Sequence, residues 1–272
     1  MTNPASLVQT VATVLGLKEY AASSVFTPQA LLREARRQKG LSAVPVPATC
    51  ILDPDGDIVR SLVATDRARA SPTWACYHTT LHLFEDEGQT YGIVGCVVGA
   101  PFAVLVAEEL FASGCEFLIS MTSSGQILPI RPPPYFIVID RALRDEGTSH
   151  HYLAPSAFSA ADAHLVRIAV DALAAGGGAI EVGATWTTDA PFRETEGAVA
   201  AARDAGILAV EMEAAALYAF AIARKARVLC FAHVTNQMGR IEGDFEKGVA
   251  DGAEESLRVI TTAARALRTQ LP

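Results

Sequence analysis

The sequence has little positive charge and no long apolar run. Its 272 residues include 22 Lys and Arg against 30 Asp and Glu, which gives a formal net charge of −8 at pH 7. Such a chain lacks the clustered basic residues that grip nucleic acid or an anionic membrane surface. No apolar run reaches the roughly 18 residues of a membrane span, and the first residues contain no basic-then-apolar leader. We therefore expect a cytoplasmic protein whose partner is a small molecule, with no nucleic acid and no membrane involved.

Cysteine and the common enzyme signatures are also scarce. The five cysteines are widely spaced, and four lie in apolar runs, which predicts reduced core thiols and no metal site. The chain contains no G-x-G-x-x-G after a strand, no G-x-x-x-x-G-K-[ST] and no H-E-x-x-H, and "MTSSG" has Met121 where a nucleophile elbow needs glycine. These absences argue against dinucleotide, nucleoside triphosphate, zinc and serine-hydrolase chemistry. We expect no cofactor.

Apolar residues are abundant and make up 50% of the chain, with a mean hydropathy of +0.26. Strand-like and helix-like stretches alternate along most of it. This order predicts a single-domain α/β fold with a mostly parallel or mixed central sheet flanked by helices. The clearest unit is a βαβ unit with strand 90–99, helix 101–114 and strand 115–121, in which Pro101 opens the helix and Gly114 ends it.

The two ends of the chain differ in texture. Residues 1–45 are predicted to be an N-terminal helical extension, with a helix that starts at Thr27–Pro28 and ends at Gly40, and residues 46–272 the α/β domain. Ser159 is predicted to cap the helix that follows it. The remaining predicted elements are strand 179–186, helix 196–205, strand 207–212, helix 213–226, strand 227–235 and a closing helix over 245–269.

Polar residues gather where the predicted strands end. In an open α/β sheet, ligands bind in the crevice at the carboxyl ends of the strands, so these positions are the candidates for function. The clusters are residues 52–57, 122–125, 186–195 with 210–213, and 233–237.

Glu211 and Glu213 flank Met212 where an apolar strand meets an alanine-rich helix. Glu213 is predicted to lie in the first turn of that helix, where the peptide dipoles favour an ionised carboxylate, and such a group can hold two sugar hydroxyls. An acid that only complements the dipole is an equally good interpretation of Glu213 taken alone. Met212 is more often core packing than a ligand contact, although here it could form a floor beneath a sugar ring.

Two further clusters carry weaker signals. "TSSG" (122–125) offers hydroxyls and a glycine, which suit an oxyanion, although a plain turn explains such a stretch more often. "LDPDGD" (52–57) suggests a calcium loop, but the glycine and glutamate that such a loop requires are replaced by Ile58 and Ala64, so we reject a metal there. Its acids fit turn formation, and one of them could polarise a water molecule.

Four segments together resemble a known family: "VEMEAAALYAFA", "WTTDAPFRETEG", "RDEGTSHHYL" and "VTNQMGRIEGDFEKG". The chain resembles the nucleoside phosphorylase superfamily, in its uridine phosphorylase and hexameric purine nucleoside phosphorylase branch, over roughly residues 46–270. The resemblance implies the fold of that family and cleavage of the N-glycosidic bond of a nucleoside. It also implies a homo-oligomer, either a dimer or a hexamer.

The resemblance also implies roles for individual residues. Glu213 would bind the ribose 2′- and 3′-hydroxyls, with Glu211 and Met212 beside the sugar. Ser123, Ser124 and Gly125 match a loop that contacts phosphate and ribose. Asn236 and Gln237 match base-contacting positions, and Phe192 matches an aromatic residue that stacks on the base. Glu213 and Asn236 are therefore the predicted catalytic residues.

The chain departs from the family at the phosphate. Two arginines that hold phosphate in the family fall at Gly56 and Ser120, and a third, lent by a neighbouring subunit, falls near Tyr77 or His78. Phosphate thereby loses its charge-matched bidentate donors. The residues that could compensate are Arg60, Arg67, Arg69 or an arginine from a partner subunit.

Three functions follow from this departure. Phosphorolysis, with phosphate as co-substrate, is preferred because the resemblance is closest to phosphorylases. Hydrolysis is the alternative, with water as acceptor and Asp53, Asp55 or Asp57 as its candidate base. A non-catalytic nucleoside-binding protein is the third interpretation.

Overall fold

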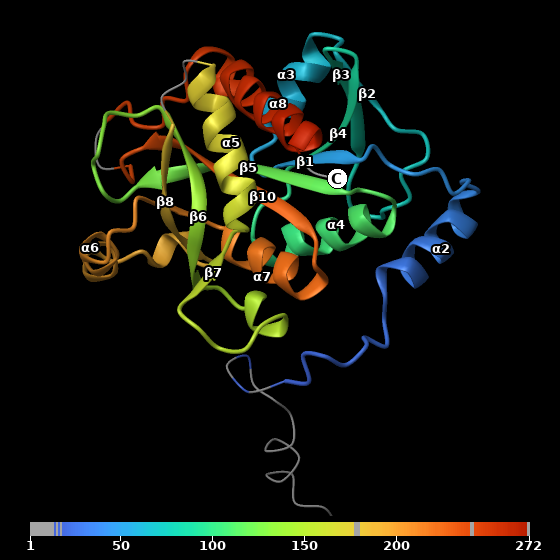
Figure 1. Ribbon diagram of the computed structural model, residues 1–272, viewed down its shortest axis with the longest axis horizontal. Coiled ribbons are helices and arrows are strands. Elements are labelled where there is room, and N and C mark those ends of the chain that lie inside the picture. The colour runs from blue at the N-terminus through green and yellow to red at the C-terminus, as the bar shows by residue number, and fades with distance from the viewer. Residues whose placement is uncertain (1–13, 15, 17, 177–179, 240–241, 271–272) are drawn as a thin grey trace, which may run out of the picture.

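Figure 1 shows a computed structural model of the chain, which describes residues 14, 16, 18–176, 180–239 and 242–270. The strands are β1 Thr49–Asp53, β2 Ala68–Ala70, β3 Leu81–Asp86, β4 Gln89–Gly95, β5 Phe117–Gln126, β6 Tyr135–Asp145, β7 Phe158–Ala160, β8 Glu181–Thr188, β9 Ala209–Glu211 and β10 Arg227–Asn236. The helices are α2 Pro28–Lys39, α3 Asp57–Ala64, α4 Ala100–Ala112, α5 Ala163–Ala175, α6 Glu196–Asp204, α7 Ala214–Arg224 and α8 Ala253–Gln270, with 3₁₀ turns η1 Ser149–His151, η2 Pro191–Arg193 and η3 Val249–Gly252.

The strands form one mixed sheet, ordered β10-β6-β8-β9-β5-β1-β4-β3-β2, with β7 added to β6. Because β10 also pairs with β5, the strands β5, β9, β8, β6 and β10 close into a ring. The predicted class, a single α/β domain with helices around the sheet, is confirmed. The sheet is less parallel than alternation alone indicates, because β3 and β4 form a hairpin and β10 runs antiparallel to β6.

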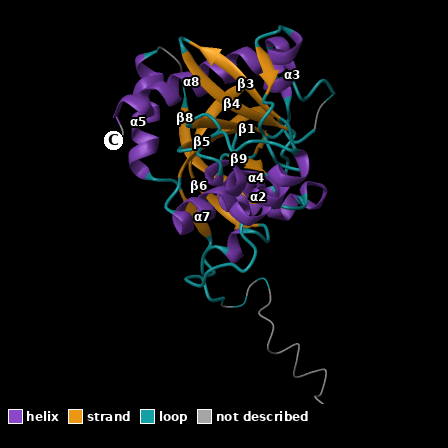
Figure 2. Ribbon diagram, turned by 90° about the vertical axis from the view of Figure 1, so that its right-hand side faces the viewer, coloured by secondary structure: helices purple, strands orange, loops and turns teal. Residues whose placement is uncertain are grey.

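Helices cover both faces of the sheet (Figures 1 and 2). On one face, α4 and α7 bury apolar side chains such as Val104 and Leu217 against the strands. On the other face, α3, α5 and α8 do the same with side chains such as Leu165 and Ile260. Strand residues therefore alternate between two cores, as the period of two along a strand requires.

The predicted βαβ unit is confirmed as β4–α4–β5. Strand β1 lies between β4 and β5 and is parallel to both, so the carboxyl ends of these three strands lie at the same edge of the sheet. Strand β10 is parallel to β5 and extends to this edge as well. The predicted polar clusters after β1, β5 and β10 are thus brought together.

Several predicted boundaries were wrong. Residues 122–125 form the last part of β5, because β10 and β9 pair with them. Helix α5 is capped by Asp162, whose side chain accepts the His164 N–H, while Ser159 belongs to β7. Helix α8 begins at Ala253 because the backbone before it is left-handed at Ala250, Asp251 and Gly252.

The predicted N-terminal helix is confirmed as α2. The Thr27 hydroxyl accepts the Ala30 N–H, and Gly40 ends the helix with φ 65°. Residues 1–13, 15 and 17 of the predicted extension lie outside the described residues, and the domain boundary at residue 45 stays a prediction. None of the described helices is both long and apolar enough to cross a membrane.

Tyr218 connects α7 to the sheet, and its replacement should destabilise the protein. Its buried hydroxyl donates to the Ile139 carbonyl at 2.6 Å and accepts the Cys230 N–H at 3.0 Å. Tyr218→Phe leaves both backbone groups unpaired in the core, so we expect the free energy of unfolding to fall by about 1–3 kcal/mol. Chemical denaturation measures this change. Tyr77→Phe, whose hydroxyl donates to the side chain of Gln38 on the surface, is the matched control and should change stability little.

Candidate active site

Glu211 anchors the start of α7. It ends β9 and is buried, and its Oε2 accepts the backbone N–H groups of Glu213 and Ala214, both at 2.7 Å. Its Oε1 accepts the hydroxyls of Thr185, at 3.0 Å, and Thr187. Burial raises the pKa of Glu211, and these four donors oppose that rise. The carboxylate is fully occupied by the protein, so it serves to hold α7 in place.

Glu213 lies at the N-cap position of α7, one residue before the predicted first turn, with non-helical φ −131° and ψ −37°. Its side chain is buried, but its contacts are polar. Oε1 accepts the Gly99 N–H at 2.7 Å, and Oε2 accepts the Thr122 hydroxyl at 2.8 Å. Burial, followed by the charge of Glu211, raises the pKa of Glu213 to about 8. Its carboxylate thus joins β5, α7 and the loop before α4.

The geometry of Glu213 suits a diol. Each carboxylate oxygen has one protein donor, and a carboxylate has about four lone-pair sites, so each oxygen can accept one more hydrogen bond. Gly99 makes the close approach possible, because its φ of 91° lies in the left-handed region that favours glycine. Two neighbouring hydroxyls on one ligand could therefore bind the two oxygens of Glu213.

The ends of β5 and β10 present hydroxyl and amide groups beside each other. The Ser123 and Thr235 hydroxyls are 2.9 Å apart. The Asn236 amide nitrogen donates to the Ser124 carbonyl at 3.4 Å and to the Thr235 hydroxyl at 3.2 Å. The hydroxyl of Ser124 is buried and has no hydrogen-bond partner among the described residues. The predicted residues Ser123, Ser124 and Asn236 are thus adjacent.

Gly125 lies against the side chains of Met238 and Asn236. A Cβ at this position would lie 2.5 Å from the Met238 sulfur and 3.2 Å from the side-chain amide oxygen of Asn236. That same oxygen accepts the Met238 N–H at 2.9 Å. A side chain at Gly125 would therefore displace the end of the Met238 side chain, and Met238 is a neighbour that sequence reasoning missed.

The predicted base-contacting and sugar-contacting residues differ in position. Met212 is half-buried between the two glutamates. The Gln237 side chain is exposed, and its backbone N–H donates to the Asp244 carboxylate at 2.8 Å. Phe192 is fully exposed in η2, so the structure does not bring its ring onto the group formed by Ser123 and Asn236.

Three carboxylates lie on the loop after β1, which we call the acid loop (residues 53–57). Asp53 is buried, and its oxygens accept the N–H groups of Gly56 at 3.2 Å and Val59 at 2.9 Å, which fixes the start of α3. Burial raises the pKa of Asp53 to about 7. Asp55 and Asp57 both accept from the Lys247 ammonium, at 2.9 and 2.6 Å.

The arginines that could replace the family's phosphate ligands are mostly engaged elsewhere. Arg60 binds the Asp57 carboxylate and the Asp55 carbonyl on the acid loop. Arg67 forms an ion pair with Glu254 on α8 at 2.7 Å, and Arg69 lies on the edge strand β2. Of these three, only Arg60 contacts the acid loop.

The other positions of the missing arginines carry no charge that binds phosphate. Ser120 is buried in β5, and its hydroxyl has no partner among the described residues. The Tyr77 hydroxyl donates to Gln38, and the Lys39 ammonium lies 5.0 Å from the centre of its ring. The backbone N–H of His78 contacts the Cys76 sulfur. Tyr77 thus contacts α2, and His78 contacts its own loop.

A family model described as "Phosphorylase superfamily" matches residues 51–268, from β1 to α8. The chain belongs to the phosphorylase superfamily. The family predicted from the four motifs is thus confirmed, and the match includes every strand end described above.

Two relatives are enzymes named for their nucleosides. A guanosine phosphorylase of Halorubrum lacusprofundi is 27% identical over 188 residues, which is 66% of this chain and 78% of the relative. A uridine phosphorylase of Thermococcus kodakarensis is 28% identical over 213 residues, which is 72% of this chain and 75% of the relative.

Sequence reasoning did not identify Gly99 or Lys247 as site residues of this superfamily member, and it included Thr122 only as part of the "TSSG" cluster. Gly99 and Thr122 fix the Glu213 carboxylate, and Lys247 binds the acid loop. A glycine two residues before a helix-opening proline is a local signal for Gly99. No local signal links Thr122 or Lys247 to its partner, because the partners come from distant segments.

Glu213→Gln should remove activity while preserving the fold. The amide keeps the shape of the side chain and can still accept the Gly99 N–H. It lacks the negative charge that stabilises the cation-like sugar in the transition state. We expect turnover to fall on the order of 100-fold or more. Steady-state kinetics with a cleaved nucleoside measures the loss, and an unchanged rate would remove Glu213 from its role.

The same variant should change how stability depends on pH. The pKa of Glu213 is about 8 in the folded protein against an ordinary 4.5, so between these values the folded state holds a proton that the unfolded state releases. This contribution is fully present below pH 4.5 and is lost as pH rises through 8. Glu213→Gln should therefore match the wild type near pH 5 and gain in melting temperature relative to it towards pH 8. A difference that shrinks with rising pH would contradict the assignment.

Proposed function

We propose that this chain cleaves the N-glycosidic bond of a nucleoside by phosphorolysis, giving the free base and a pentose 1-phosphate. The observation that carries the proposal is the Glu213 carboxylate at the strand–helix junction, with one protein hydrogen-bond donor on each oxygen. Membership of the phosphorylase superfamily and the names of the two relatives support it. Homo-oligomerisation, as a dimer or hexamer, and a cytoplasmic location stay predictions.

The side chains present match the demands of the reaction. An oxygen of hydrogen phosphate forms a bond to the sugar C1′ while the C1′–N bond breaks. The electron pair of the broken C1′–N bond goes to the base. The proton of hydrogen phosphate ends on the base. Positive charge develops on the sugar in the transition state, so an ionised Glu213 beside the 2′- and 3′-hydroxyls stabilises it more than the ground state.

The remaining strand-end groups take the other two tasks. The Ser123 and Thr235 hydroxyls can donate to phosphate oxygens. The Asn236 amide, which lies against Gly125, would hydrogen-bond the leaving base. Hydrogen bonds that the substrate hydroxyls donate to Glu213 favour its ionised form and lower its pKa. Glu213 therefore becomes ionised when the nucleoside binds.

Hydrolysis is a second candidate, favoured by the negative charge of the acid loop. Gly56 and Ser120 stand where the family has phosphate-binding arginines, and three carboxylates lie close by. Asp53 is occupied at the start of α3, whereas the Asp55 side chain is 33% exposed. Asp55 is therefore the better placed of these two for a base that activates water.

Base release with and without phosphate tests the main proposal. A panel that includes guanosine and uridine should show base release only with phosphate or arsenate, and pentose 1-phosphate should form in equal amount with phosphate. Chromatography of the products measures both. Release of free pentose at the same rate in phosphate-free buffer would establish hydrolysis instead, and tight binding without release would leave a nucleoside-binding protein.

The hydrolytic candidate makes its own prediction. If Asp55 activates water, Asp55→Asn should lower base release in phosphate-free buffer on the order of 100-fold. An unchanged rate in that buffer would remove Asp55 from this role.

A further inference from the structure

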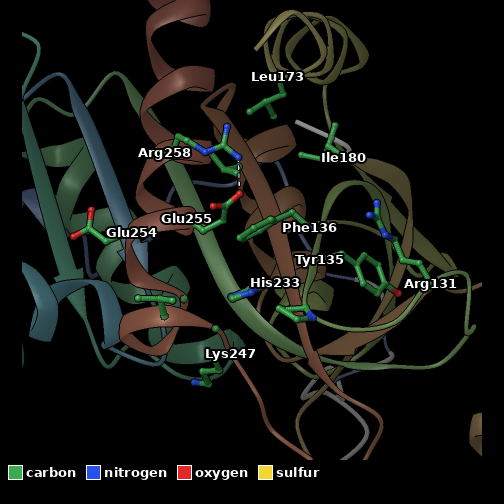
Figure 3. Close-up of a pocket in the computed structure, with 15 residues that line it drawn as sticks. Arg131, Tyr135, Phe136, Leu173, Ile180, His233, Lys247, Glu254, Glu255 and Arg258 are labelled. Atoms are coloured by element: carbon green, nitrogen blue, oxygen red, sulfur yellow. Dashed lines mark hydrogen bonds and ion pairs between the residues drawn. The ribbon is translucent and has the colours of Figure 1, made fainter. Parts of the chain in front are cut away.

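Lys247 connects two parts of the molecule that are far apart in the sequence. Its ammonium lies 2.9 Å from an Asp55 carboxylate oxygen and 2.6 Å from one of Asp57. It belongs to the segment between Asn236 and α8, so it joins the base side of the proposed site to the acid loop. Figure 3 shows Lys247 beside His233 at a cavity of about 490 Å³ that Phe136 and Arg258 also line.

The Lys247 backbone lies beside His233, a residue of β10 two positions before Thr235. A Cβ on Gly252 would collide with both the Lys247 carbonyl and the His233 ring, so those two groups lie side by side. His233 is in register with Ser123 on the neighbouring strand, and the Ser123 hydroxyl contacts Thr235. The Lys247 segment therefore extends from His233 on β10 to the acid loop after β1.

The charge of Lys247 acts on the groups around it. Burial opposes its charge, yet the hydrogen bonds that its ammonium donates to Asp57 and Asp55 raise the pKa of Lys247, so it is a cation at neutral pH. Burial, followed by the charge of Lys247, lowers the pKa of His233 to about 4, so this neighbouring imidazole is neutral. Asp55 is near enough to Glu213 for its charge to contribute to the raised pKa there, after burial and Glu211.

The other cations that line this cavity have partners away from the strand ends. Arg258 pairs with Glu255 on its own helix α8, and Arg131 lies 3.4 Å from Glu181. Figure 3 shows Arg258 and Arg131 on different sides of the cavity, with His233 and Lys247 closer to each other. Lys247 is thus the cation of this set that joins the acid loop.

We propose that Lys247 is the cation that holds the acceptor phosphate in this chain, exchanging its contacts with Asp55 and Asp57 for the phosphate oxygens. The proposal rests on the phosphorolysis proposed above and names the residue that replaces the family's arginines. An ammonium binds phosphate as a point charge rather than as a bidentate fork. Asp55 and Asp57 compete with phosphate for the same cation, so the acid loop weakens phosphate binding.

Opposite effects of two single variants test this role. Lys247→Met should raise the KM for phosphate by about tenfold or more and change the KM for the nucleoside much less, and Lys247→Arg should restore part of the loss. Asp55→Asn removes one competitor, so it should lower the KM for phosphate. Arg258→Met is the matched control, because it removes a cation of the same cavity that pairs within α8; its KM for phosphate should equal that of the wild type.

A purely structural role of the Lys247–Asp55 ion pair gives a different pattern. Both variants would then break the same contact and shift the KM for phosphate in the same direction, which would overturn the proposal. Protection against thermal unfolding by inorganic phosphate gives a readout without turnover: we expect it in the wild type and in Asp55→Asn, and not in Lys247→Met.

The failures of the two proposals are distinguishable. If the wild type releases base only with phosphate, but Lys247→Met keeps the wild-type KM for phosphate and its thermal protection, the Lys247 assignment is overturned and phosphorolysis stands. If the wild type releases base independently of phosphate, phosphorolysis itself fails, and the role of Lys247 fails with it.

Discussion

The site depends on the carboxylate of Glu211 and the four donors that converge on it. Two backbone N–H groups at the start of α7 and the hydroxyls of Thr185 and Thr187 on β8 occupy both of its oxygens. Since unpaired N–H groups at a helix start require acceptors, this carboxylate fixes where α7 begins and in which direction it leaves the sheet. Glu213, two residues on, is thereby placed between Gly99 and Thr122.

The two glutamates show how environment separates the roles of identical side chains. Glu211 has every lone pair directed at the protein, whereas Glu213 has one protein donor on each oxygen. Burial and the neighbouring charge raise the pKa of Glu213 to about 8, so its charge is unfavourable until a ligand supplies further donors. A buried carboxylate of this kind destabilises the empty fold and is retained where binding or catalysis uses it.

The acceptor side of the site is electrostatically balanced. The acid loop carries Asp55 and Asp57, and Lys247 and Arg60 are bound to them. An anion that enters must exchange with these carboxylates, while water need not. The choice between phosphate and water therefore depends on how strongly Lys247 prefers phosphate to the carboxylates that already hold it.

The sequence by itself determined the α/β class, the βαβ unit, helix α2 and the family, because hydrophobic period, capping residues and motifs are local patterns. It also pointed to Glu213, Ser123 and Asn236 as strand-end groups, which the structure places near one edge of the sheet. Only the tertiary structure decided that the "TSSG" residues belong to a strand, that Glu211 is a structural anchor, and that Lys247 meets the acid loop. The partners that decide these roles are remote in the chain, as Gly99 is from Glu213 at 114 positions, and strand register and sheet closure alone bring them together.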